Sequence, residues 1–213
     1  MLMLDLIEII KPEDIEKRSF EMITEILGER KFPPMHGPIV KRVIHTTADF
    51  DYADLVNIGD NAVESAFTAI KGGCSMVTDT KMAAAGINKK NLAKYGGQVY
   101  CFMDDEEIAL KAKARNVTRS SLCMERAVKD SNTKIFVIGN APTALIRLYE
   151  LINEGLADPA LVIGVPVGFV NVVESKELIK KLKVPYIISE GRKGGSNVAA
   201  AIVNAIVYMM GRD

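Results

Sequence analysis

The chain has 213 residues, 48 % of them hydrophobic and 25 % charged, which is typical of a globular protein and predicts one domain over residues 1–213. Its 27 Lys and Arg balance 27 Asp and Glu, which argues against a general nucleic-acid binder, because such proteins need excess positive charge. Three scattered cysteines and two histidines form no metal-ligand pattern, so we expect neither a zinc or iron–sulfur site nor a disulfide framework.

Both ends of the chain are apolar, but neither has the pattern of a leader or a membrane anchor. Residues 1–10 contain Asp5 and Glu8 and lack a basic region and a cleavage site. The apolar stretch at 198–210 is shorter than the ~20 residues that span a bilayer. We therefore expect a cytoplasmic protein with reduced cysteines and no membrane contact, and the N-terminal segment is a candidate partner surface.

A first helix is predicted to begin at Pro12, because proline is favoured in the first turn and the acidic residues beside it complement the helix dipole. Ile15, Met22 and Ile26 then share one face, and Ser19 lies near the middle of that face. A serine in this position either bonds back to the preceding turn or faces a polar group over which the helix packs.

A proline-rich turn at residues 31–38 separates this helix from a second one. Apolar residues recur at helical spacing over 39–44, and the segment ends in Ile44-His45-Thr46-Thr47. Residues 60–70 are predicted to form the next helix, which is followed by two glycines that are typical of a helix end.

Short apolar runs then alternate with helical patterns. The predicted strands are 74–78, 99–103, 135–138, 161–165 and 185–189. Several are apolar without alternation, as strands covered on both faces are. The pattern predicts an α/β fold: a single three-layer domain with a mainly parallel sheet, helices on both faces and a flavodoxin-like, doubly wound topology. In such sheets ligands bind outside the carboxyl ends of the strands.

Two glycine-rich loops follow predicted strands and precede helices, so their backbone N–H groups are expected to face an anion. Neither GNAPTA at 139–144 nor GRKGGS at 191–196 has the spacing of a nucleotide fingerprint. Each loop is therefore either a site for phosphate or carboxylate or a plain turn. Arg192 and Lys193 favour binding of an acid in the second loop.

His45 is one of two candidates for proton transfer by imidazole near neutral pH. Arg42 lies three residues earlier on the same helical face, so the two side chains can reach one ligand. The alternative is a histidine that caps its own helix by bonding the last carbonyl groups. His36, in the proline-rich turn, is predicted to be a surface residue.

Two further functional classes are open on the residues alone. Asp79, Asp104 and Asp105 at predicted strand ends, with Lys193 downstream, would fit a signalling receiver, although such carboxylates equally well cap the helices that follow. A nucleotide-using methyltransferase or kinase would need a fingerprint that both glycine loops lack.

Six segments, taken in order over about residues 12–207, resemble the precorrin-8X methylmutase family. They are KRVIHTTADFDY, VTDTKMAAAGI, NVTRSS, IGNAPTALIRLYEL, LVIGVPVGFVNVVESKELI and EGRKGGSNVAAAIVNA. The combination of IGNAPTAL, PVGFV followed by ESK, and GRKGGS is highly specific, because no physical requirement brings all three into one chain.

The resemblance implies an isomerase of cobalamin biosynthesis that moves a methyl group from C-11 to C-12 of (cobalt-)precorrin-8, giving hydrogenobyrinate or cobyrinate by an acid-assisted 1,5-shift. It implies His45 as the catalytic acid, a homodimer with the ligand near the subunit interface, and neither cofactor nor metal site, any cobalt belonging to the tetrapyrrole substrate. The residues implied in substrate binding are Ser19, Arg42, Thr118, Arg119, Arg192, Lys193 and Gly194.

The chemistry of such a substrate agrees with the residues. A flat, apolar ring edged with acetate and propionate groups requires an apolar pocket with Arg and Lys side chains for the carboxylates. The alternative function is a non-catalytic corrinoid-binding carrier, which would keep the acid-binding loops and have no use for a proton donor.

Overall fold

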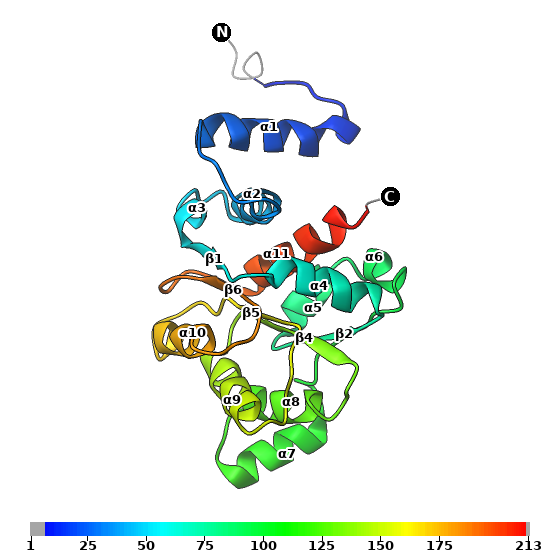
Figure 1. Ribbon diagram of the computed structural model, residues 1–213, viewed down its shortest axis with the longest axis vertical. Helices are drawn as coiled ribbons and strands as arrows, with labels where there is room; N and C mark the ends of the chain where they lie inside the picture. Colours follow the sequence, from blue (N-terminus) through cyan, green and yellow to red (C-terminus); the bar gives the residue numbers. More distant parts are fainter. Residues whose placement is uncertain (1–6, 212–213) are drawn as a thin grey trace.

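The computed structural model describes residues 7–211 and is built around a six-stranded sheet (Figure 1). Its strands are β1 (Val56–Ile58), β2 (Ser75–Thr78), β3 (Val99–Tyr100), β4 (Thr133–Ile138), β5 (Leu161–Gly164) and β6 (Tyr186–Ser189). They lie in the order β1-β6-β5-β4-β2-β3, and every pairing is parallel except that of β1 with β6.

The five parallel strands follow the flavodoxin-like order, which confirms the predicted fold class. Each predicted strand overlaps an observed one. The sixth strand, β1, was not predicted. Its three half-buried residues, at the antiparallel edge of the sheet, are too few to give a recognisable alternation in the sequence.

Helices cover both faces of the sheet (Figure 1). On one side lie α2 (His36–Thr47), α3 (Tyr52–Leu55), α4 (Ala62–Lys71), α5 (Lys81–Gly86), α6 (Lys89–Ala93) and α11 (Ser196–Met209). On the other side lie α7 (Glu106–Arg115), α8 (Arg119–Ala127), α9 (Pro142–Asn153) and α10 (Val172–Lys180). Met76 and Ile135 point into the first core, and their neighbours Val77 and Phe136 into the second. Because successive strand residues face opposite sides, strands that serve two cores are continuously apolar.

The position of α2 determines where its polar side chains lie. Its residues Ile39, Val43 and Ile44 are buried against the layer that contains α11, which in turn covers the sheet. This packing uses the apolar side of α2, and the side that carries Arg42 and His45 contacts Phe20 of the first helix. Within residues 7–211, no helix combines the length and the apolar character needed to cross a membrane.

The helix α1 (Ile15–Leu27), which follows a turn of 3-10 helix at Pro12–Asp14, lies on the outer side of α2, farthest from the sheet (Figure 1). The apolar face identified from the sequence is not the packed one, because Ile15, Met22 and Ile26 are 52, 45 and 63 % exposed. The helix packs through the adjacent stripe, on which Ile23 is buried. Residues 1–6 of the candidate N-terminal partner surface lie outside the described residues.

Candidate active site

His45 lies exposed in the last turn of α2, and its ring stacks on Phe20 of α1, with the centroids 5.1 Å apart and the planes inclined by 20°. The backbone itself caps this helix end. Ala48 adopts a left-handed conformation (φ 53°), and its N–H donates to Ile44 O at 2.7 Å. Within residues 7–211 the imidazole makes this ring contact and no hydrogen bond, so it does not serve as the helix cap.

Arg42 lies one turn before His45, and its half-buried guanidinium is held from three sides. It lies 4.5 Å from the ring centroid of Phe20 and 5.2 Å from that of Tyr208, and it forms an ion pair with Glu16 of α1. A planar cation between two rings keeps its N–H edge in a fixed orientation, which suits recognition of a carboxylate. As the spacing predicted, Arg42 and His45 line one hollow, of about 260 Å³.

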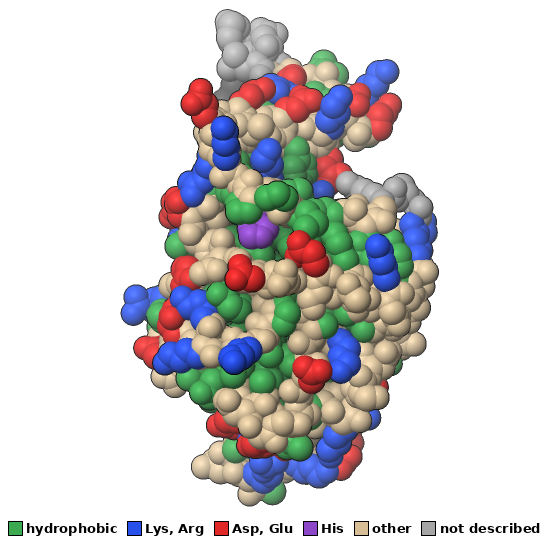
Figure 2. Space-filling model, in the orientation of Figure 1, with side chains coloured by type: hydrophobic (Ala, Val, Ile, Leu, Met, Phe, Trp, Pro, Cys, Tyr) green, Lys and Arg blue, Asp and Glu red, His purple; other side chains and the backbone are tan. Residues whose placement is uncertain are grey.

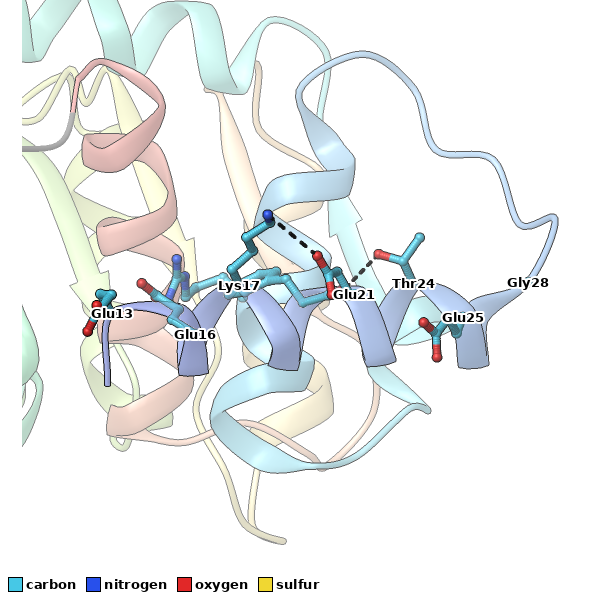
Figure 3. Close-up of a pocket in the computed structure, with 9 residues that line it drawn as sticks. Glu13, Glu16, Lys17, Glu21, Thr24, Glu25 and Gly28 are labelled. Atoms are coloured by element: carbon cyan, nitrogen blue, oxygen red, sulfur yellow. Dashed lines mark hydrogen bonds and ion pairs between the residues drawn. The ribbon is translucent and has the colours of Figure 1, made fainter. Parts of the chain in front are cut away.

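Two larger hollows adjoin Arg42, and Phe20 of α1 lines both of them. One, of about 590 Å³, is lined mainly by apolar side chains together with Arg30, Lys41 and Arg42. Figure 2 shows hydrophobic side chains gathered around a histidine on the face of the molecule beneath α1. The other, of about 880 Å³, lies along α1 and is edged by Glu13, Glu16, Glu21 and Glu25 (Figure 3). A ligand with several carboxylates is repelled by the acidic hollow and attracted by the basic one.

The loop between β6 and α11 reaches the segment that follows α2. Lys193 Nζ lies 2.6 Å from a carboxylate oxygen of Asp49 and 2.6 Å from one of Asp51. These hydrogen-bonded carboxylates raise the pKa of Lys193, and its ammonium lowers the pKa of Asp49. The ammonium expected to face the substrate is thus engaged by the protein itself, whereas Arg192 beside it is exposed.

Gly194 is required by a close approach of the loop to the end of β5. It has φ +158°, and a Cβ at this position would overlap the carbonyl of Val165. The N–H of Gly195 donates to the same carbonyl at 2.9 Å. The loop is therefore fixed at the carboxyl edge of the sheet, where ligands of this fold class bind.

The GNAPTA loop already holds an anion that belongs to the protein. Asp79, 1 % exposed at the end of β2, accepts hydrogen bonds from the N–H groups of Gly139, Asn140 and Ala141 at 2.9, 2.8 and 2.6 Å. Burial raises the pKa of Asp79, and these three bonds oppose the shift. Of the two alternatives left open for this loop, the contact favours a turn without a ligand over a site for phosphate or an external carboxylate. The contact joins the carboxyl ends of β2 and β4, where the strand order reverses.

The remaining predicted site residues lie apart from the hollow that Arg42 and His45 line. Thr118 is the N-cap of α8, on the opposite side of the sheet, and its hydroxyl accepts from Ser121 N–H at 3.3 Å. Arg119 follows it and is exposed. Ser19 Oγ donates to Ile15 O at 2.9 Å, which is the bond to the preceding turn that the sequence allowed.

The carboxylates at strand ends do not form a receiver site. Asp104 pairs with Lys81, Asp105 caps α7 by accepting from two backbone N–H groups, and Asp79 is buried as described above. The signalling-receiver hypothesis is therefore wrong, and the helix-capping alternative is confirmed for Asp105. Within residues 7–211, no group of three or more His, Cys, Asp or Glu side chains could hold a metal ion.

The sequence analysis missed Glu16, Phe20 and Tyr208, which surround Arg42. Glu16 and Phe20 are four residues apart and share a stripe of α1. The sequence analysis chose the adjacent stripe as the apolar face of the helix, because that stripe is more apolar. Tyr208 belongs to an apolar run, so its contact with Arg42 follows only from the packing of α2 on α11.

Comparisons with known proteins agree with one another. The sequence profile of precorrin-8X methylmutase matches residues 14–209. A cobalt-precorrin-8 methylmutase from Priestia megaterium is 46 % identical over 197 residues, covering 92 % of this chain and 88 % of that protein. One from Salmonella typhimurium is 45 % identical over 204 residues, covering 93 % and 95 %. The solved precorrin-8X methylmutase from Thermus thermophilus has a TM-score of 0.84 and 38 % identity, covering 92 % and 96 %.

Proposed function

This chain belongs to the precorrin-8X methylmutase family, and from that premise we propose which of its residues bind the substrate and which one acts as the acid. The protein is an isomerase of cobalamin biosynthesis that moves the methyl group of (cobalt-)precorrin-8 from C-11 to C-12, giving hydrogenobyrinate or cobyrinate. The observation that carries this conclusion is the family match over residues 14–209.

His45 is the proposed catalytic acid. Its exposed imidazole has no hydrogen-bond partner among residues 7–211, and it shares a hollow with Arg42. Protonation of the conjugated macrocycle makes the 1,5-shift of the methyl group easier, and one positioned acid contributes about 10²–10⁴-fold in rate. Substrate and product are isomers, so the proton that enters the ring leaves it again. The shift is intramolecular, and its remaining requirement is a ring held rigidly.

Positive charge around the hollow supports binding of the peripheral acetates and propionates. Arg42 is oriented by two aromatic rings, and Arg30 and Lys41 line the neighbouring apolar hollow. An apolar floor with a few oriented cations suits a flat, hydrophobic polycarboxylate. The residues proposed to contact the substrate are Ser19, Arg42, Thr118, Arg119, Arg192, Lys193 and Gly194.

Thr118 and Arg119 are assigned to the rim of the macrocycle that lies away from His45. They lie at the carboxyl edge of the sheet, as the loop that carries Arg192 does, but on the side of α8: the Thr118 hydroxyl lies 2.8 Å from that of Thr143 in the first turn of α9, which follows β4. A planar ligand laid across this edge would place its carboxylates on both sides of the sheet.

We also propose a homodimer in which a second copy covers the exposed face of α1. Ile15, Met22 and Ile26 form this face, and burying them in an interface is favourable by about 25 cal/mol per Å² of apolar surface. Ser19 lies on the same face, so a second copy there would bring this serine to the subunit interface. This supports a ligand site near the contact between subunits.

Cobalt-precorrin-8 is the preferred substrate in this proposal, because the relatives at 46 and 45 % identity carry that name. The cobalt is part of the substrate, and the protein itself is proposed to need no cofactor. We place the reaction in the cytoplasm, with the three cysteines reduced; Cys74 and Cys123 are buried thiols.

An absorption time course tests the proposal. The shift reorganises the conjugated system, so the spectrum of precorrin-8, with or without cobalt, changes on turnover. The wild-type protein and a His36→Ala control are expected to convert the substrate. His45→Ala is expected to bind it and to react about 10²–10⁴-fold more slowly.

Each alternative gives a different result in the same assay. Binding without conversion by the wild-type protein would favour the corrinoid carrier over the isomerase. Equal turnover by His45→Ala and wild type would leave the isomerase standing and remove His45 as its acid. The cobalt preference is contradicted if the metal-free substrate is converted with the higher kcat/KM.

A further inference from the structure

Lys176, on α10, is a buried lysine whose ammonium group donates all of its hydrogen bonds to one neighbouring segment. The residue is 1 % exposed. Its Nζ donates to Ser189 Oγ at 3.2 Å, to Gly191 O at 2.8 Å and to Lys193 O at 2.9 Å. An ammonium group has three N–H bonds, so each has a partner at the end of β6 or in the loop that follows.

Among residues 7–211, no carboxylate forms an ion pair with this ammonium. Glu190, the carboxylate whose charge acts on Lys176, is itself bound by Asn57 Nδ2 at 2.8 Å and Lys180 Nζ at 3.0 Å. Burying a charge without a counter-charge is costly, and an apolar side chain would fill this space without that cost. What a lysine adds here, and an apolar side chain would not, is the set of three hydrogen bonds to the end of β6 and the loop that follows it.

These bonds fix the backbone on both sides of Arg192. Lys176 holds the carbonyls of residues 191 and 193, and the carbonyl of Arg192 accepts from Gly168 N–H at 3.2 Å. Three consecutive carbonyls are thus bound, while the Arg192 side chain remains exposed. A side chain on an anchored backbone has a fixed starting point and direction.

We propose that Lys176 is a positioning residue for substrate binding, because it anchors the backbone on both sides of Arg192 and so aims this guanidinium at a peripheral carboxylate of the macrocycle. The inference rests on the proposed function, in which Arg192 is a substrate contact. It adds a residue that the substrate never touches.

The position of Arg192 predicts which kinetic constant changes. A carboxylate at the rim of the macrocycle does not react, so its contact with Arg192 is equally strong in the bound substrate and in the transition state. Loss of such uniform binding raises KM and leaves kcat nearly unchanged. A variant that is merely unstable would lose active protein instead, which lowers the apparent kcat at constant KM.

Lys176→Met tests the proposal, with Lys181→Met as the control, because Lys181 is an exposed lysine at the end of the same helix. We expect KM, and the dissociation constant from a spectral titration with cobalt-precorrin-8, to rise about 10–100-fold in Lys176→Met, with kcat within about threefold of wild type. Trypsin is expected to cleave after Arg192 or Lys193 faster in this variant, because its loop is no longer anchored. The control is expected to match wild type in each respect.

An unchanged KM and dissociation constant, with or without a loss of active protein, would overturn the proposal. If Lys176→Met does not fold, Ser189→Ala replaces it. This change removes one of the three acceptors of Lys176 and also the hydrogen bond that Ser189 Oγ donates to Lys193 O at 2.7 Å. It is expected to raise KM about fivefold or more, because each lost hydrogen bond is worth ~1 kcal/mol, and an unchanged KM would again overturn the proposal. Failure of the wild-type protein to turn over would count against the proposed function alone, since the titration and the proteolysis still report on Lys176.

Discussion

The ring of Phe20 lies against the imidazole of His45, 5.1 Å away between centroids and nearly parallel to it. This contact joins α1, the outermost helix, to the end of α2. The same phenyl ring also lies under the guanidinium of Arg42 at 4.5 Å. One apolar side chain therefore orients both the proposed acid and the proposed carboxylate contact.

Phe20→Leu is expected to lower kcat/KM by up to about tenfold, because aromatic contacts of this kind contribute about 0.5–1.5 kcal/mol beyond their area. Leucine keeps an apolar side chain on the packed stripe of α1 and removes the stack. Leu110→Met, at an exposed apolar position of α7 on the opposite side of the sheet, is the control and is expected to have no effect. Steady-state kinetics distinguish the two, and equal kinetics for both variants would show that the stack has no role in turnover.

Glu16 forms an ion pair with Arg42, so its carboxylate competes with the substrate carboxylate that is proposed to bind the same guanidinium. Glu16→Gln removes the competing charge, so KM is expected to fall about two- to fivefold at low salt, the scale of a partly exposed ion pair. The difference from wild type should shrink as salt screens the pair. Glu21→Gln changes a carboxylate on the same helix that pairs with Lys17 and Arg18 instead, and serves as the control. A KM that rises in Glu16→Gln would show that Glu16 orients Arg42 productively.

The fold and the pair of Arg42 and His45 could be predicted because both depend on local spacing. Continuous apolar runs between helical patterns indicate a parallel sheet, and residues three apart on a helix share a face. The contact of Asp79 with residues 139–141 could not be predicted in this way. It joins segments about 60 residues apart and exists only because β2 and β4 are neighbours in the sheet.

The face of α1 that packs was also beyond local spacing. The stripe of Ile15, Met22 and Ile26 and the stripe of Phe20 and Ile23 both repeat at helical period, so periodicity alone cannot choose between them. The contacts with α2 determine which stripe packs, because the cation of Arg42 and the ring of His45 both lie against Phe20.

Asp79→Asn is expected to lower the free energy of unfolding by about 2–4 kcal/mol at pH 7, measured by urea denaturation. The carboxamide has one acceptor oxygen for three backbone N–H groups, and its NH₂ group faces donors. Asp105→Asn is the control, because asparagine caps a helix as well as aspartate does, and a change below about 0.5 kcal/mol is expected. Similar losses in both variants would contradict a special role for Asp79.

Lys193 has two possible roles that one pair of variants separates. If Lys193 contacts the substrate, as proposed, Asp51→Asn removes a competing carboxylate and lowers KM a few-fold, while Lys193→Met raises KM about tenfold. If Lys193 only ties the loop to the segment after α2, both variants raise KM. Asp60→Asn, at an exposed aspartate between β1 and α4, controls for general effects of charge removal.

The anchor at Lys176 predicts a pH dependence of substrate affinity. Burial lowers the pKa of Lys176 from 10.5 to about 8, and the charge of Glu190 opposes this shift. The other charged groups nearby are committed elsewhere, Lys180 to Glu190 and Lys193 to Asp49 and Asp51. Above pH 8 the neutral amine has two N–H groups for three acceptors, so KM is expected to rise.

Over the same range the free energy of unfolding is expected to rise with pH, while the affinity for the substrate falls. In the unfolded chain Lys176 keeps its proton up to about pH 10.5, so between about pH 8 and 10.5 the unfolded state binds more protons and the contribution of this residue to stability rises with pH. Urea denaturation and KM, measured from pH 7 to 9.5, therefore separate loosening of the loop from unfolding. In Lys176→Met, KM is expected to be high and flat across this range. If the alkaline rise in KM persists in that variant, another group is responsible for it.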